Sequence, residues 1–312
     1  MRARIAVVGA GHVGATCAQH IAERALGDVV LLDVIEGIPQ GKALDLAESA
    51  PVESFDGRVV GSNAPADIAG SALVVVTAGK ARTPGMTRED LLLGNAAVIR
   101  SVAQSIRQEA PDAVVIVVTN PLDVMCWLMR ALTGFETSRV VGMAGILDTA
   151  RFRTFLSQET GVSVRDIQAM VLGGHGDAML PLLRYSTISG IPVEHFLPPE
   201  QLSAIVERTR RGGIEIINYL KSGSAYYAPA SGAAEMAEAV LRDQHRLLPC
   251  SAHLDGQYGL REVYIGVPVI LGAGGVERVV EIELTEEETT ALRTSAEVVG
   301  EGIQVLRDKG FV

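Results

Sequence analysis

Five short runs of almost entirely apolar residues divide the first half of the chain. Strands covered on both faces, as in a parallel sheet, have this composition, whereas strands with one face in water alternate apolar and polar residues. Segments with helical periodicity separate the runs and complete repeated strand–helix–strand units. The pattern predicts an α/β fold with a doubly wound parallel sheet. Its strands are expected at 4–9, 29–33, 73–77, 114–119 and 139–143, and its helices at 13–24, 41–47, 91–109 and 121–132.

The order of elements changes after about residue 145. Two apolar runs, 261–272 and 276–284, are separated only by Ala-Gly-Gly, which predicts an antiparallel hairpin. We therefore expect a second, α+β domain over residues 144–312, packed tightly against the first because no Pro/Gly/Ser-rich linker separates them. Its other elements are a strand-like stretch at 182–190 and helices at about 147–160, 200–220, 230–243 and 285–307.

A glycine motif stands between the first expected strand and the first helix. Gly9, Gly11 and Gly14 form a GxGxxG pattern, and the second strand ends in Asp33. In a dinucleotide-binding unit the glycines allow a tight turn, close approach of the pyrophosphate and helix packing, while the acid binds the adenosine ribose. An acid here would repel a 2′-phosphate, which favours NAD over NADP. Glycines that serve only a tight turn are the alternative.

We therefore predict that residues 1–143 form a Rossmann domain that binds NAD. The anionic pyrophosphate would lie at a helix N-terminus, where unpaired N–H groups favour negative charge. The whole loop should contact the cofactor, so Ala10, His12 and Val13 are predicted binding residues beside the three glycines.

The stretch VLGGHGDAMLP, residues 171–181, places His175 among three glycines. Glycines give the ring little side-chain cover and let another group come close. Histidine titrates near neutral pH, so His175 is a candidate general acid and base. A glycine-rich turn with a surface histidine is the alternative for this stretch taken alone.

Other polar residues occupy positions suited to a small anionic ligand. Arg82 and Arg88 lie in a glycine- and proline-containing loop whose composition suits a mobile lid. Asp148 and Arg151 are three residues apart at the start of an expected helix, so they share a face. Asn120 follows an expected strand, at the sheet edge where ligands of such folds bind. The alternatives are that the loop arginines are simply solvated and that Asp148 is a charge at a helix N-terminus, where the helix dipole favours it.

Composition excludes several classes of partner. The net charge of −10 argues against nucleic acid and against anionic membrane surfaces, which both require clustered Lys and Arg. Three widely spaced cysteines without a CxxC pattern indicate reduced thiols in a cytoplasmic protein. The early arginines and following apolar run resemble a signal peptide, but the run is short and His12 interrupts it. We expect a soluble protein without a membrane span.

Six motifs together resemble the malate and lactate dehydrogenase family, in its lactate-dehydrogenase-like malate branch, over essentially the whole chain. They are GAGHVG, VTAGKARTPGMTREDLL, VTNPLD, GILDTARFR, GGHGDAMLP and GSAYYAPAS, in the family's order and at its spacing. The chain differs mildly from the family pattern at His12, inside the glycine loop, and at Ala178, which leaves any hydroxyl contact at that position in doubt.

The resemblance implies roles for individual residues. His175 is then the catalytic acid and base, with Asp148 as its partner. Arg151 binds the C1 carboxylate of the substrate, and Arg88 polarises the substrate carbonyl when its loop closes.

The resemblance also implies which residues lie near the nicotinamide and which residue selects the substrate. Asn95, Asn120 and the backbone of Val118 lie at the nicotinamide end, and Asn120 contacts substrate as well. In the family, arginine at the position of Arg82 accompanies malate and glutamine accompanies lactate. A second carboxylate under a lid needs a charged partner, for which arginine is suited.

The implied function is NAD-dependent interconversion of malate and oxaloacetate, by a homodimer or homotetramer. A dehydrogenase of lactate or another 2-hydroxy acid is one alternative, and a non-catalytic NAD-binding sensor is another. The sensor would not need His175, Asp148 and Arg151 together. No metal is expected, because the spacing of His245, Cys250 and His253 matches no common set of ligands.

Overall fold

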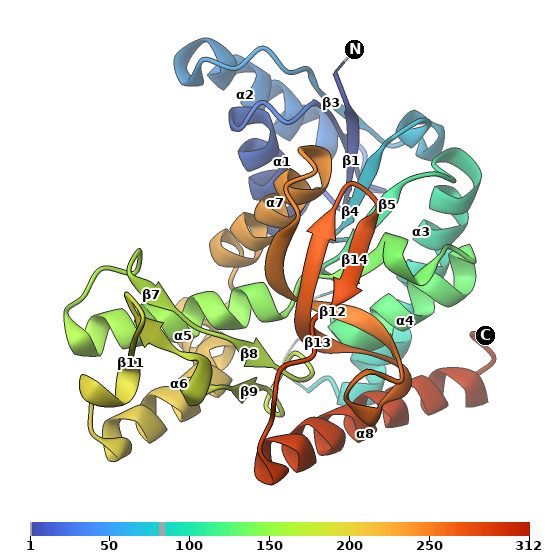
Figure 1. Cartoon of the computed structure of the whole chain (residues 1–312). Coiled ribbons are helices and arrows are strands. Elements are labelled where there is room, and N and C mark those ends of the chain that lie inside the picture. Colours follow the sequence, from blue (N-terminus) through green and yellow to red (C-terminus); the bar gives the residue numbers. More distant parts are fainter. Residues whose placement is uncertain (1, 81–84) are drawn as a thin grey trace.

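The computed structural model describes residues 2–80 and 85–312, and its central feature is one long sheet (Figure 1). Within the described residues the sheet has nine strands in the order β14-β13-β12-β6-β5-β4-β1-β2-β3, and β1 to β6 run parallel. The predicted doubly wound parallel sheet is therefore confirmed. The parallel strands are β1 (Arg4–Val8), β2 (Asp28–Leu32), β3 (Val59–Ser62), β4 (Leu73–Val76), β5 (Val114–Val117) and β6 (Val140–Gly142).

Strand β3 is absent from the sequence prediction, and its position explains why. It lies at the edge of the sheet, and only its first and last residues are buried, so it lacks the continuous apolar signal of the central strands. Gly61 in this strand lets α2 pack closely, because a Cβ there would lie 2.1 Å from the carbonyl oxygen of Pro39.

Helices cover both faces of the parallel part and agree with the sequence prediction to within a few residues, except α2. The predicted segment 41–47 is only the middle of α2, which has Pro39 in its first turn and Pro51 near its end. The helices of this part are α1 (His12–Glu23), α2 (Ile38–Glu53), α3 (Arg88–Glu109) and α4 (Leu122–Thr133). A capping box of Thr87 and Asp90 starts α3 at Arg88.

The second part of the chain extends the same sheet. The predicted hairpin is confirmed as β13 (Arg261–Gly272) and β14 (Gly275–Val279), although β14 ends five residues early. Strand β12 (Arg246–Asp255) pairs with β13 and, through Ser251 and Gly142, with β6. The helices here are α5 (Gly145–Thr160), α6 (Pro199–Leu220), α7 (Tyr227–Leu241) and α8 (Glu286–Asp308).

Short elements replace the strand expected at 182–190. The chain forms a 3₁₀ turn at Leu183–Tyr185 and then only a two-residue strand. Two small sheets hold this region: β7 (Ile167–Gln168), β10 (Thr187–Ile188) and β11 (Ile191–Pro192) in one, β8 (Val171–Leu172) and β9 (Leu180–Pro181) in the other.

The buried residues form two groups. The larger core runs through β1 to β6 and continues into α7, β12, β13 and α8, and a smaller core lies within residues 152–206. The division at 143/144 therefore crosses a shared core, and it stays a prediction.

Candidate active site

The glycine loop between β1 and α1 has a different geometric reason for each glycine. Gly9 has a φ of +105°, and a Cβ there would lie 2.6 Å from the backbone nitrogen of Ala78. A Cβ on Gly14 would lie 1.8 Å from the carbonyl oxygen of Gly9, so α1 packs directly on the turn. A Cβ on Gly11 would meet open space. The loop is thus tight on its inner side and open where α1 begins, which suits an approaching pyrophosphate.

Asp33, just after β2, closes the far side of this loop. Its carboxylate accepts hydrogen bonds from the backbone of Ala10, at 2.6 Å, and of Ile35, at 3.0 Å. Lys42 of α2 donates to the carbonyl oxygen of Ala10 at 2.7 Å. Lys42 was not predicted from the sequence, because no motif marks it. His12 and Val13 open α1, and the His12 ring lies 5.0 Å from that of Tyr226.

Asn95 of α3 lies against the segments that follow β4 and β5, the second of which carries Asn120. Asn95 is buried, and its amide accepts from Lys80 N at 2.7 Å and donates to the carbonyl oxygen of Asn120 at 2.6 Å. Val118 donates its N–H to Val76 at 2.8 Å. Asn95 thus fixes the two loops, and its contact with the cofactor stays a prediction, as do those of Asn120 and Val118.

The His175 loop is held by the elements around it. Gly173, with a φ of +88°, exchanges backbone hydrogen bonds of 2.9 and 3.1 Å with Gly266 of β13. A Cβ on Gly174 would lie 3.3 Å from Ser295 Oγ, close enough to press on α8. The glycines therefore let the loop pass close to β13 and α8, so that the His175 ring faces Asp148 of α5.

Asp148 joins His175 and Arg151 in one buried network. Its Oδ2 lies 2.8 Å from His175 Nδ1, and its Oδ1 accepts a hydrogen bond of 3.2 Å from Arg151. The side chains are 3% (Asp148), 15% (His175) and 13% (Arg151) exposed, so solvent screens these charges weakly. Gly212 and Gly213 of α6 face the Arg151 side chain, and a Cβ on Gly212 would lie 3.1 Å from its Cδ.

The network raises the pKa of His175. Burial lowers the pKa of this ring, as does the positive charge of Arg151, but the charge and hydrogen bond of Asp148 offset both. The negative charge of Asp123 acts in the same direction as Asp148. The protonated ring, which can donate a proton to a ketone oxygen, is thereby favoured.

Arg88, the first residue of α3, lies near the same loop. Its guanidinium is 3.3 Å from the carboxylate of Asp177, and both side chains are mostly exposed. Arg82, the predicted determinant of substrate choice, lies outside the described residues.

The chain is similar to known proteins over nearly its whole length. Residues 3–142 match the NAD binding domain of lactate/malate dehydrogenase, and residues 146–307 match the alpha/beta C-terminal domain of lactate/malate dehydrogenase. A malate dehydrogenase of Roseiflexus castenholzii is 54% identical over 307 residues, which are 98% of this chain and 99% of that protein.

The chain belongs to the lactate/malate dehydrogenase family.

Solved structures of this family include both activities among the close neighbours. The malate dehydrogenase of Cryptosporidium parvum superposes with a TM-score of 0.97 at 42% identity, covering 99% of this chain and 100% of that one. A lactate dehydrogenase from the same organism, complexed with lactic acid and β-nicotinamide adenine dinucleotide, has a TM-score of 0.95 at 42% identity, with 98% of each chain covered. Backbone similarity at this level does not separate the two substrates.

One residue beside His175, Asp123, was not predicted from the sequence. Asp123 of α4 lies within hydrogen-bond distance of the His175 backbone, at 2.8 Å. The signal was present, since Asp123 ends the VTNPLD motif, but only the fold places α4 beside a loop 52 residues later.

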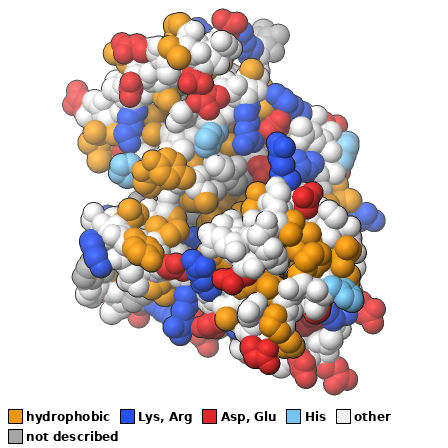
Figure 2. Space-filling view, turned by 90° about the vertical axis from the view of Figure 1, so that its left-hand side faces the viewer, with side chains coloured by type: hydrophobic (Ala, Val, Ile, Leu, Met, Phe, Trp, Pro, Cys, Tyr) orange, Lys and Arg blue, Asp and Glu red, His pale blue; other side chains and the backbone are white. Residues whose placement is uncertain are grey.

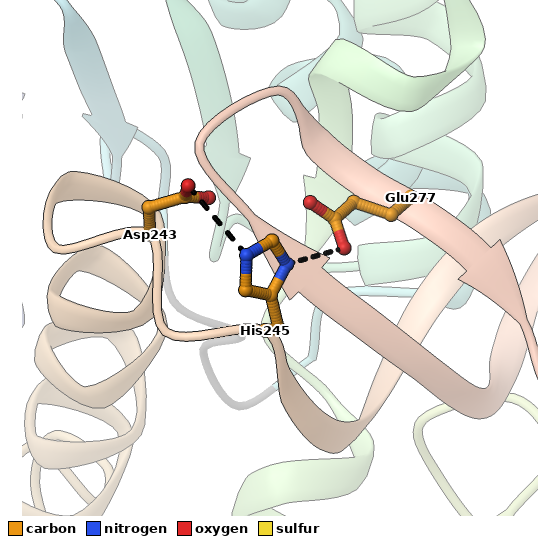
Figure 3. Close-up of side chains that lie close together, drawn as sticks. All are labelled: Asp243, His245 and Glu277. Carbon is orange, nitrogen blue, oxygen red and sulfur yellow. Dashed lines mark hydrogen bonds and ion pairs between the residues drawn. The ribbon is translucent and has the colours of Figure 1, made fainter.

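A cluster of ionisable side chains lies on the surface between the end of α7 and β14 (Figure 3). His245 Nδ1 is 2.8 Å from Glu277, and its Nε2 is 3.6 Å from Asp243, so the ring lies between two carboxylates. When protonated, the ring donates a hydrogen bond to Glu277 and lies at ion-pair distance from Asp243. The pKa of His245 is raised by its hydrogen bond to Glu277 and by the charge of Asp243. The two acids therefore favour the protonated form of His245.

The structure does not bring together the three residues considered above as metal ligands, which are His245, Cys250 and His253. Cys250 is buried, whereas His245 is exposed and turned to the two acids. His253 lies near Glu262 and the ring of Tyr264.

Within the described residues, every helix is too short or too polar to cross a bilayer.

Proposed function

We propose that the chain is an NAD-dependent malate dehydrogenase, which interconverts malate and oxaloacetate. The observation that carries the proposal is the buried network of Arg151, Asp148 and His175. Arg151 Nε is buried and lacks a hydrogen-bond partner among the described residues, so the guanidinium has capacity left for a carboxylate. His175, the proposed general acid and base, has its Nδ1 atom 2.8 Å from the same Asp148 carboxylate.

NAD fits the first domain of this proposal. Gly9, Gly11 and Gly14 hold the pyrophosphate at the start of α1, where Gly11 leaves space and Gly9 and Gly14 allow close packing. Asp33 binds the adenosine ribose, and Asn95, Asn120 and Val118 lie at the nicotinamide end, with Ala10, His12 and Val13 completing the loop. Hydride acceptance is the chemistry that this group supplies when bound.

His175 moves the proton of the reaction. Asp148 accepts from Nδ1–H, so the neutral ring presents the lone pair of Nε2, which takes the hydroxyl proton when malate is oxidised. In the reverse direction the imidazolium returns that proton to the carbonyl oxygen. The carboxylate of Asp148 stabilises the imidazolium without taking its proton.

Arginines bind the two carboxylates of the substrate. Arg151 pairs with the C1 carboxylate beside His175, and Asn120 and Arg88 contact the oxygen on C2. Arg82 pairs with the C4 carboxylate, a role that rests on the sequence resemblance. The Roseiflexus protein, named malate dehydrogenase at 54% identity, favours this assignment over lactate.

An absorbance assay tests the proposal. The purified chain is mixed with NADH and either oxaloacetate or pyruvate, and the loss of NADH absorbance is followed. We expect rapid oxidation with oxaloacetate and at least about a hundredfold lower efficiency with pyruvate, because its methyl group offers no carboxylate to pair with the proposed partner Arg82. Preference for pyruvate would contradict the malate assignment, and NADH binding without turnover would identify a sensor.

The proposed enzyme has an NAD-binding domain at 1–143 and a catalytic domain at 144–312, and it forms a homodimer or homotetramer. Apolar side chains exposed on α6 support assembly: Ile214, Ile217, Tyr219 and Leu220 are 43–79% exposed. The face in Figure 2 carries groups of hydrophobic side chains beside a hollow between its upper and lower parts. Light scattering tests the proposed assembly. Wild type should have the mass of a dimer or tetramer, and Ile217→Asp should have a lower mass. A monomeric wild type would contradict the proposal.

The proposed location is the cytoplasm, where the reaction is a step of the tricarboxylic acid cycle. Cys17, Cys126 and Cys250 are buried free thiols, which suit a reducing compartment.

A further inference from the structure

Asp123 lies in the first turn of α4 and is 4% exposed. Its Oδ2 accepts a hydrogen bond of 2.8 Å from the backbone N–H of His175, and its Oδ1 accepts one of 2.7 Å from the hydroxyl of Ser251 in β12. One buried carboxylate therefore joins α4 and β12 to the loop that carries His175.

The neighbouring amide provides a comparison inside the same loop. Gly174 N donates to the hydroxyl of Ser295 in α8 at 2.8 Å, so two consecutive N–H groups have different acceptors, one neutral and one acidic. A hydroxyl can satisfy a backbone amide without the cost of burying a carboxylate. Holding the main chain therefore does not by itself explain why the acceptor of the His175 N–H is a carboxylate, that of Asp123.

The charges around His175 indicate that reason. Asp148 and Arg151 face it from α5, Asp123 faces it from α4, and Asp177 lies two residues on, paired at the surface with Arg88. Burial raises the pKa of the thiols of Cys126 in α4 and Cys250 in β12, which therefore stay uncharged. Arg151 opposes a proton on His175, so a second acid offsets it.

Asp123 and His175 influence each other's charge. The pKa of Asp123 is raised, chiefly by burial and in smaller part by the negative charge of Asp148. The Ser251 hydroxyl, the His175 amide and the His175 charge act in the opposite direction and favour the carboxylate. An imidazolium thus favours the carboxylate form of Asp123, and by linkage that carboxylate favours the imidazolium.

We propose that Asp123 is a positioning residue for proton transfer: it fixes the main chain from which the His175 ring projects and supplies a second negative charge to the imidazolium. The inference rests on the proposed role of His175 as general acid and base. It distinguishes Asp123 from Ser295, which holds the same loop without a charge.

The test compares Asp123→Asn with Ser295→Ala as the matched control. Asparagine keeps the shape and one oxygen acceptor but removes the charge, whereas Ser295→Ala removes a neighbouring tie and no charge. For each protein, kcat and KM are measured across pH with oxaloacetate and with malate. Reaction of His175 with diethyl pyrocarbonate, followed by residue-resolved mass spectrometry, gives the titration of the ring without turnover.

We expect Asp123→Asn to lower kcat about ten- to a hundredfold in both directions, because small displacements of a catalytic group cost about this much. Its kinetic and modification profiles both shift to lower pH, with NADH affinity unchanged. Ser295→Ala keeps the wild-type pH profile. Superimposable profiles for Asp123→Asn and wild type would overturn the inference.

A second variant covers the case in which Asp123→Asn does not fold. Ser251→Ala removes one donor to the carboxylate, which raises the pKa of Asp123 and reduces the fraction that is ionised. The His175 profile should therefore shift in the same direction by a smaller amount. No shift in this variant would overturn the inference. A wild type inactive with both substrates would instead overturn the proposed function, and the modification profile would still report on Asp123.

Discussion

Two glycine-rich loops carry the proposed chemistry, and they are built in opposite ways. The loop at 9–14 sits between one strand and the helix that follows it. Its close contacts come from itself and from residues 77 and 78, just after β4, and Asp33 and Lys42 hydrogen-bond to Ala10. The loop at 173–176 is held by residues 123, 148, 266 and 295, from four different elements. The first is a local motif completed by the sheet, and the second is an assembly of distant segments. Substitutions should therefore separate cofactor binding from proton transfer.

The largest effect is expected at the centre of the assembled loop. His175→Asn should lower kcat about a thousandfold, because general acid and base catalysis contributes about this much, while NADH affinity stays unchanged. Fluorescence titration with NADH and the absorbance assay measure the two quantities. An equal loss of both would show that the two loops are not independent.

The variant Arg82→Gln tests whether a residue of the NAD-binding domain determines the choice of substrate. Removing one partner of a desolvated ion pair costs about 3 to 5 kcal/mol, or roughly two to four powers of ten in efficiency with oxaloacetate. Relative use of pyruvate should rise, and NADH affinity should hardly change. Measuring kcat/KM for both acids decides this, and an unchanged preference ratio would count against the assignment.

Two substitutions inside the local motif should act differently from each other. Gly11→Ala points into open space, so thermal stability should be preserved while NADH affinity falls about tenfold, or about 1.4 kcal/mol. Gly9→Ala forces a side chain into a φ of +105° and against the Ala78 backbone, so it should cost more than about 2 kcal/mol of unfolding free energy. Calorimetry and NADH titration of both variants provide the comparison, which equal stability losses would contradict.

The smallest effect is expected at His245, far from both loops in the sequence. Its pKa is raised in the folded protein by Glu277 and Asp243, so its contribution to stability is fully present below the unfolded value of about 6.5. That contribution is lost as pH rises through the higher folded value. Thermal unfolding from pH 6 to 9 should show a slightly smaller decline in His245→Gln than in wild type. Parallel curves would mean that the two acids do not favour the charged ring.

Local patterns in the sequence were enough to predict much of the fold. Continuous apolar runs predicted five of the six parallel strands, since a strand covered on both faces can hardly contain polar residues. Edge strand β3 was missed because it is half exposed and therefore lacks that signal. Helical periodicity likewise acts over a few residues, and it predicted α3 from residue 91. The helix begins three residues earlier, at Arg88, where Thr87 and Asp90 form a capping box.

Site residues that depend on a motif could be named from the sequence, and those that depend on packing could not. The glycines, Asp33, His175, Asp148 and Arg151 belong to motifs whose residue types match a known chemistry. Only tertiary structure placed Asp123 beneath His175, put Gly212 against Arg151 and carried one sheet across both halves of the chain. The physical reason is that hydrogen bonds and close packing join atoms near in space, whereas sequence patterns record only what neighbouring residues require of one another.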